Sequence, residues 1–197
     1  MCIRDRGSPA PGGGSVAALS GALGAALGTM VANLSTSKAG FEDQKDKLDK
    51  IASKGQAVKD ALIIAIDDDT SAFDQVIKAM RMPKDTDADK KSRETVMQEG
   101  YQIATQVPLE TVKHCRDALQ ICSEISKLMD DGMASDVGSG ALMANAGAKA
   151  AAYNVRINLK SIKNEKFCKA TGKDLEKLID ECNLLTESVT QNVDKTL

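Results

Sequence analysis

Residues 16–34, VAALSGALGAALGTMVANL, consist almost entirely of alanine, glycine, leucine and other uncharged residues. Their large apolar side chains recur every three or four positions, the spacing of one face of a helix. These are Val16, Leu19, Leu23, Leu27, Met30 and Leu34. A second stripe holds only small residues: Ala17, Gly21, Gly24, Gly28 and Ala32. Each helical glycine costs about 1 kcal/mol relative to alanine, so we expect another helix backbone to pack closely against this stripe.

A membrane span is the alternative interpretation of this segment, because about 20 mainly apolar residues suffice to cross a bilayer. Six of residues 16–34 are Gly, Ser, Thr or Asn, however, and no charged anchor pattern flanks them. We therefore predict a buried helix and no membrane partner. Lys plus Arg total 26 against 28 Asp plus Glu, and aromatic residues make up 3%. This composition argues against nucleic acid as a partner.

Helical periodicity dominates the rest of the 197-residue chain. We predict further helices over about 43–80 and 92–130, a fourth with Ser135 as its N-cap, and a fifth from near Thr171. The charged stretch KDTDADKKSR is expected to be a loop, and Pro108 to kink or break the third helix by removing the bond to the Ala104 carbonyl. The fold class is therefore all-α, a bundle of about five mostly long helices. Residues 9–197 form a single domain in this prediction, and residues 1–8 are a disordered or non-native leader.

The five cysteines fit no metal-binding spacing. Cys115 and Cys122 lie on one helical face roughly 10 Å apart, which is too far for a disulfide. We interpret the cysteines as small buried hydrophobic residues, which predicts a cytoplasmic protein.

A run of three glycines, Gly12, Gly13 and Gly14, precedes Ser15 where the first helix begins. Unhindered backbone N–H groups at the positive end of a helix dipole can bind an anion. The alternative is a flexible entry loop with an N-cap, and composition favours neither.

Three consecutive aspartates lie in the middle of the second predicted helix, within AIDDDTSAFDQV. Asp69 falls on the apolar stripe of that helix, whereas Asp67 and Asp68 point to its sides. Burial raises the pKa of a carboxyl group, which suits a general acid or base near neutral pH. The alternative is a buried aspartate that is hydrogen-bonded to a neighbouring helix.

The fourth predicted helix displays two amides, Asn154 and Asn158, on a face otherwise formed by small residues. This pattern indicates a polar ligand site or, alternatively, hydrogen bonds between helices. Arg156 lies elsewhere around the turn, where it either receives an anionic ligand group or belongs to a solvated face.

Three segments together resemble the cyclodeaminase/cyclohydrolase family, which includes the C-terminal domain of formiminotransferase-cyclodeaminase and stand-alone methenyltetrahydrofolate cyclohydrolases. They are PAPGGGSVAALSGALGAALGTMVANL, DDDTSAFDQVIKAMRMPK and SDVGSGALMANAGAKAAAYNVRINL. The resemblance spans residues 9 to about 193. It implies an all-helical homodimer that closes 5-formimino-tetrahydrofolate to 5,10-methenyl-tetrahydrofolate with release of ammonia. A tetrahydrofolate derivative is then the substrate, no metal or redox cofactor is expected, and a glutamate formiminotransferase is a candidate partner.

The resemblance also suggests roles for individual residues. Asp69, and after it Asp67, would carry protons during ring closure. The substrate would be bound by Gly12, Gly13, Gly14, Ser15, Asp136, Asn154, Arg156 and Asn158. Two alternatives remain: a methenyltetrahydrofolate cyclohydrolase that uses the same pocket, and a non-catalytic helical dimerisation module.

Overall fold

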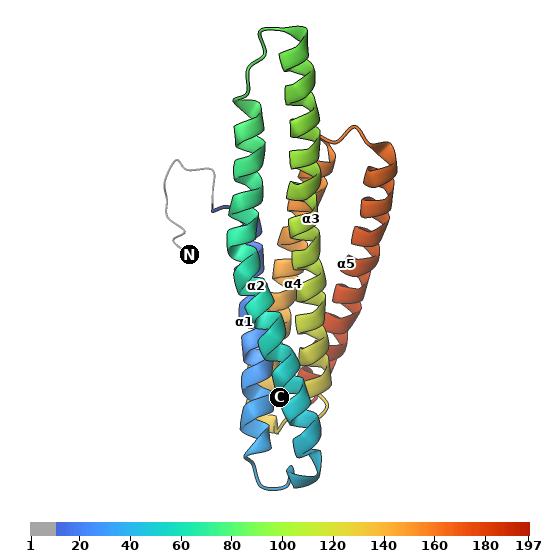
Figure 1. The fold of residues 1–197 in the computed structure, drawn as a ribbon. Coiled ribbons are helices and arrows are strands. Elements are labelled where there is room, and N and C mark those ends of the chain that lie inside the picture. The colour runs from blue at the N-terminus through green and yellow to red at the C-terminus, as the bar shows by residue number, and fades with distance from the viewer. Residues whose placement is uncertain (1–10) are drawn as a thin grey trace.

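The computed structural model describes residues 11–197, and the predicted leader, residues 1–8, lies outside this range. Five long helices make up nearly all of it (Figure 1). They are α1 (Gly13–Thr36), α2 (Lys45–Met80), α3 (Asp87–Ile125), α4 (Ala134–Leu159) and α5 (Glu165–Asp194). Two single 3-10 turns, η1 (Glu42–Gln44) and η2 (Asp131–Met133), precede α2 and α4. The predicted all-α fold class is confirmed.

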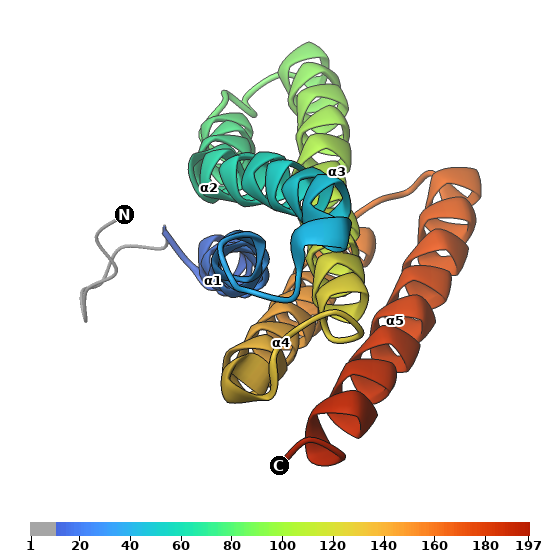
Figure 2. The ribbon, with the colours of Figure 1, turned by 90° about the horizontal axis from the view of Figure 1, so that it is seen from below.

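α1 to α4 run alternately in opposite directions along the length of the bundle (Figure 1), and α5 crosses its outside obliquely (Figure 2). α1 packs against α2, α3 and α4, while α5 packs against α3 and α4 on the outside of the bundle (Figure 2). α2 and α3 extend past the other helices as a hairpin. Because α1 and α4 are antiparallel, the start of α1 lies beside the end of α4.

The small-residue stripe of α1 is buried, as predicted, and all of its members, Ala17, Gly21, Gly24, Gly28 and Ala32, lie in the bundle interior. A methyl group added at Gly24 would lie 2.8 Å from the Ala144 side chain of α4, so glycine is what permits this approach. The large apolar stripe faces outward instead, with Leu23 47% and Leu34 53% exposed. α1 is long and apolar enough to cross a membrane, yet most of its length is buried among other helices of the chain. This burial supports the interpretation as a core helix.

Two predicted helix starts are wrong, because polar capping groups lie where loops were expected. α3 begins at Asp87, inside the stretch predicted as a loop, since Thr86 and Asp89 form a capping box there. α5 begins at Glu165 rather than near Thr171, because the Asn164 side chain accepts a hydrogen bond from the Phe167 N–H. α4 begins at Ala134, close to the predicted start, but it continues from a 3-10 turn, so its N-cap is Met133 and not Ser135.

Pro108 lies inside α3, which continues through it without a break. A proline in a helix leaves the carbonyl four residues earlier without its usual donor. In α3 that carbonyl belongs to Ala104, and the Asn158 side chain of α4 donates to it over 2.6 Å. α3 therefore shows no break at Pro108, where α4 supplies the missing hydrogen bond, and a kink, the other predicted outcome, stays a prediction.

Cys115, Cys122 and Cys182 are buried free thiols, as predicted, whereas Cys168 is partly exposed. Burial raises the pKa of the Cys122 thiol to about 12. A buried, protonated thiol behaves as a small apolar side chain.

Candidate active site

Three of the predicted segments meet at the N-terminus of α1. Asp69 of α2 lies so close to Gly14 that a methyl group added there would overlap its carboxylate. On the other side, a methyl group added at Gly13 would lie 3.5 Å from the Asn154 side-chain nitrogen of α4. The glycine run therefore lets α1 begin directly between a carboxylate and an amide.

Asp69 is half-buried and is bound by one residue of α1. Its Oδ2 accepts a hydrogen bond from Ser15 Oγ over 3.0 Å, and the Ser15 backbone N–H donates to the same carboxylate. The N-cap of α1, Gly12, provides no side-chain acceptor. Asp69 therefore caps α1 from a neighbouring helix, which matches the structural alternative considered for it.

Burial raises the pKa of Asp69 above its ordinary value, and the two hydrogen bonds from Ser15 partly oppose this rise. A raised pKa brings proton exchange closer to neutral pH, as a general acid or base requires. Capping and proton transfer are therefore compatible roles for one carboxylate.

Ser15 is 0% exposed, and its hydroxyl points inward. Besides Asp69, Ser15 Oγ lies 3.1 Å from the Ile66 carbonyl oxygen of α2. The Ser15 hydroxyl thus has two acceptors within the protein, and substrate binding by Ser15 stays a prediction. The Ile66 carbonyl was missed by the sequence analysis, because side-chain patterns contain no signal for a backbone acceptor.

Gly13 is exposed, and the first N–H groups of a helix have no partner within it. Asn154 is half-buried and donates its Nδ2 to the Ala150 carbonyl over 2.9 Å, which leaves its Oδ1 as an acceptor next to Gly13. The start of α1 thus offers backbone donors and one amide oxygen beside Asp69. Substrate binding by Gly12, Gly13, Gly14 and Asn154 stays a prediction.

Other predicted residues lie away from this cluster within one chain. Asp67 is exposed and, two positions before Asp69, points about 200° around the helix from it. Asp136 precedes Asn154 by 18 positions, about 27 Å along α4, at the opposite end of that helix. Arg156 pairs with Glu176 of α5 over 2.9 Å.

Asn158, the second predicted amide, has its Nδ2 engaged with the Ala104 carbonyl of α3. This contact matches the alternative of hydrogen bonding between helices. Of the two amides, therefore, only Asn154 lies beside the glycine run.

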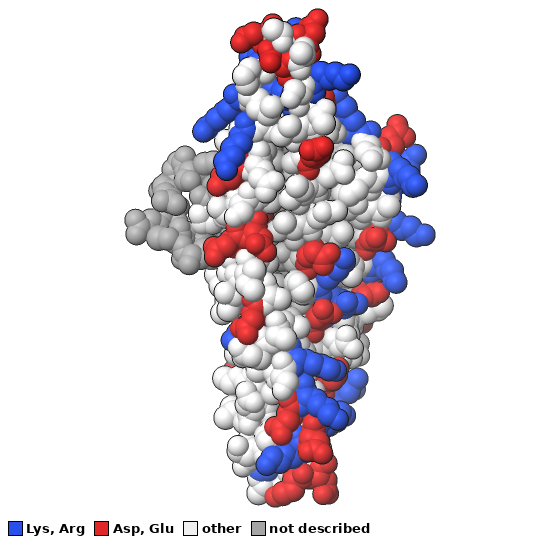
Figure 3. All heavy atoms as spheres, viewed as in Figure 1, with Lys and Arg blue, Asp and Glu red and all other residues white. Residues whose placement is uncertain are grey.

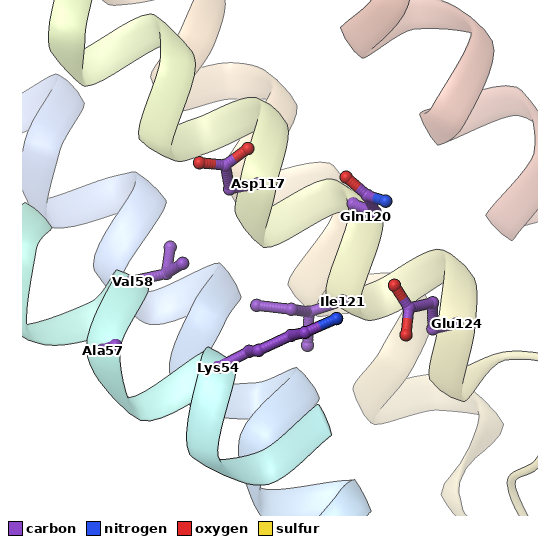
Figure 4. Close-up of a pocket in the computed structure, with 7 residues that line it drawn as sticks. All are labelled: Lys54, Ala57, Val58, Asp117, Gln120, Ile121 and Glu124. Carbon is purple, nitrogen blue, oxygen red and sulfur yellow. The ribbon is translucent and has the colours of Figure 1, made fainter. Parts of the chain in front are cut away.

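A separate cavity of about 360 Å³ lies between α2 and α3 (Figure 4). Lys54, Asp117 and Glu124 provide its charged side chains, around an apolar floor that includes Val58 and Ile121. Val58 precedes Asp69 by 11 positions, about 16 Å along α2. None of the predicted site residues lines this cavity.

Comparison with known proteins identifies the relatives of this chain. A family model described as formiminotransferase-cyclodeaminase matches residues 4–177. The match begins within residues 1–8, and the interpretation of those residues as a leader stays a prediction. The chain is 36% identical to a methenyltetrahydrofolate cyclohydrolase of Methylorubrum extorquens over 94% of its own length and 89% of that protein. It is 34% identical to the formimidoyltransferase-cyclodeaminase of Gallus gallus over 88% of its length, but covers only 32% of that protein.

Among solved structures, a formiminotetrahydrofolate cyclodeaminase from Thermotoga maritima superposes with a TM-score of 0.87 at 26% identity. The alignment covers 96% of this chain and 91% of that one. The match of the family model, the sequence identities and the structural superposition agree. The chain belongs to the formiminotransferase-cyclodeaminase family.

Proposed function

We propose that the chain is a formimidoyltetrahydrofolate cyclodeaminase, in which Asp69 transfers protons during closure of the methenyl ring. The main support is the half-buried Asp69 carboxylate held against the glycine run at the start of α1. The names of the structural neighbour and of the animal relatives supply the substrate class.

Ring closure requires two proton movements at neighbouring nitrogens. The N10 nitrogen of tetrahydrofolate attacks the formimino carbon and forms the new C–N bond, and N10 loses its proton. The formimino group enters in its protonated form, so its nitrogen already carries two hydrogens. This nitrogen gains the proton that N10 lost, its bond to the carbon breaks, and it leaves as ammonia while the methenyl product keeps the positive charge. One carboxylate placed between the two nitrogens performs both steps, first as a base and then as an acid.

The substrate assignment is tested by presenting the purified chain with 5-formimino-tetrahydrofolate. We expect the absorbance of 5,10-methenyl-tetrahydrofolate to rise and ammonia to appear in equal amount. If no product forms, and tetrahydrofolate does not raise the melting temperature, the chain does not bind folates and the non-catalytic alternative applies.

A methenyltetrahydrofolate cyclohydrolase is the second candidate, because the Methylorubrum relative with that name is similar over nearly its whole length. Hydrolysis places water, rather than ammonia, at the same carbon, and Asp69 would activate the water. The same assay started from 5,10-methenyl-tetrahydrofolate separates the two reactions. A faster loss of methenyl absorbance than its formation from the formimino substrate would assign the chain as the hydrolase.

The proposed enzyme is a homodimer, joined through the outward face of α1 and the adjoining α4. From Gly13 to Thr36, α1 carries no charged residue, and its flank is uncharged in Figure 3. Exposed apolar side chains continue onto α4, where Tyr153 is 70% and Ile157 58% exposed. An apolar face of this kind marks an interface, and a two-fold dimer is the commonest solution. Tyr153 directly precedes Asn154, so a second copy would border the site.

Light scattering on the purified chain tests this interface. We expect the mass of two chains, and a shift toward one chain in Leu23→Glu, because the new carboxylate would be buried in the interface. Leu184→Glu, on α5 away from this face, is the matched control and should remain dimeric. A monomeric wild-type protein at micromolar concentration would overturn the proposal.

A further inference from the structure

The Ser15 hydroxyl lies within hydrogen-bonding distance of two acceptors but carries only one proton. Its Oγ is 3.0 Å from Asp69 Oδ2 and 3.1 Å from the Ile66 carbonyl oxygen. A hydroxyl can rotate and can accept as well as donate. Two arrangements of the same three groups are therefore available without movement of any heavy atom.

Each arrangement fits one protonation state of Asp69. When Asp69 is ionised, the Ser15 hydroxyl donates to its carboxylate, and the Ile66 carbonyl still accepts from its own helix. When Asp69 is protonated, its O–H donates to Ser15 Oγ, and the Ser15 hydroxyl donates to the Ile66 carbonyl. In both states every buried polar group has a partner, which avoids the cost of an unsatisfied buried donor or acceptor.

We propose that Ser15 is a positioning residue that keeps Asp69 hydrogen-bonded in both of its protonation states, by turning its hydroxyl between Asp69 and the Ile66 carbonyl. This inference rests on the proposed function, in which Asp69 alternately takes up and releases a proton. The full burial of Ser15 supports it, because water cannot replace the hydroxyl proton there. Gly14 supports it as well, because no side chain at that position separates α1 from the carboxylate.

Within residues 11–197, which the structure describes, few charged groups lie where they could alter the protonation of Asp69. α1 carries no titratable side chain between Gly13 and Thr36, and on α4 Arg156 is paired with Glu176. The remaining titratable groups on nearby turns lie elsewhere: exposed Asp67 on α2, and Asp68, Glu110 and His114 around a separate cavity between α2 and α3. The hydroxyl is therefore the group whose removal should change Asp69 most directly.

The test is the pH at which Asp69 titrates, followed by carbon NMR of its carboxyl group and by the pH profile of kcat/KM. Ser15 bonds to Asp69 in both states, but a hydrogen bond to the ionised carboxylate is roughly twice as strong as one to the neutral acid. In Ser15→Ala we therefore expect the midpoint to rise by about half to one pH unit. The acid limb of the kcat/KM profile should move by the same amount. Ser15→Cys is the second variant, for use if the alanine variant folds poorly. Its thiol fills similar space but is only a weak donor, so it should move the midpoint in the same direction.

The matched control is Ser20→Ala. Ser20 also lies on α1 and also donates to a neighbouring helix, with its Oγ 2.7 Å from the Met143 carbonyl oxygen, but no carboxylate is involved. Its removal should leave the Asp69 midpoint unchanged. The inference is overturned if the midpoint in both Ser15 variants stays within 0.2 pH units of the wild type, a margin of about 0.3 kcal/mol, or if Ser20→Ala moves it equally. A shifted NMR midpoint in a chain without folate activity would instead reject the proposed function and leave the role of Ser15 intact.

Discussion

Asp69→Asn is expected to abolish most of the catalytic activity while leaving the fold at least as stable as the wild type at neutral pH. Asparagine has nearly the same shape, and its Oδ1 can accept the hydrogen bond that Ser15 Oγ donates to the carboxylate. It cannot take up a proton, so kcat should fall about 10²- to 10⁴-fold, the usual contribution of general acid–base catalysis. The measurement is kcat on the formimino and methenyl substrates.

The stability of this variant depends on pH in a defined direction. Burial raises the pKa of Asp69 in the folded state above its unfolded value. The stabilisation from the protonated group is therefore complete below the unfolded pKa and is lost as pH rises through the folded pKa. Asparagine does not ionise, so the variant keeps its stability as the pH rises. The melting temperature of Asp69→Asn minus that of the wild type should therefore increase with pH across that interval.

Asp67→Asn is the matched control on the same helix. Asp67 is exposed and points away from Ser15, so its amide variant should retain most of the activity. A larger loss in Asp67→Asn than in Asp69→Asn would transfer the catalytic role to Asp67. A fully active Asp69→Asn protein would leave Asp69 as a cap of α1 and nothing more.

The position of Asp69 was predictable because it follows from helical spacing alone. Leu62 and Ile66 precede it at steps of four and three, both are buried, and the carboxylate shares their side of α2. A half-buried carboxylate needs donors, and a helix start without a polar cap needs an acceptor. Those two requirements are met at one contact between Asp69 and Ser15, which the sequence presents 54 positions apart.

The orientation of α1 was harder to predict, because two stripes compete for the interior. Amphipathic patterns are usually assigned with their largest apolar residues inward. In α1 the interior belongs to the glycine and alanine stripe, because close backbone contact replaces side-chain volume. Leu23 and the other large apolar residues of α1 remain exposed, where a second chain can contact them. The sequence of α1 alone does not specify which of its two stripes packs inside the chain and which faces outward.

The role of Asn158 illustrates a second limit. The sequence predicted correctly that Pro108 deprives the Ala104 carbonyl of its donor, and it separately marked Asn158 as a polar residue on a small-residue face. Asn158 donates to the Ala104 carbonyl only because α3 and α4 pack in one particular register, and local sequence patterns do not encode that register. Long-range register therefore separates a structural amide, Asn158, from Asn154, which lies one turn away beside the site.

The contact between α1 and α4 at Gly24 predicts a large loss of stability in Gly24→Ala. An added methyl group would lie 2.5 Å from the Gly140 carbonyl oxygen and 2.9 Å from the Ala144 backbone nitrogen. Backbone atoms of a packed helix cannot turn aside as a side chain can, so the helices must separate. Overpacking of this kind costs about 1–3 kcal/mol, and we expect a value near the upper end despite the higher helix propensity of alanine.

Gly172→Ala in α5 is the matched control, because beyond its chain neighbours and the adjoining backbone of its own helix no atom lies within 4 Å of the methyl group it would add. It gains helix propensity without a clash, so its free energy of unfolding should rise by about 0.5–1 kcal/mol. Both variants are measured by denaturant unfolding at one protein concentration, since self-association would otherwise shift the midpoint. The same substitution is thus expected to lower the free energy of unfolding in α1 and to raise it in α5. Equal stability of both variants would mean that α1 and α4 adjust to the added methyl group at little cost.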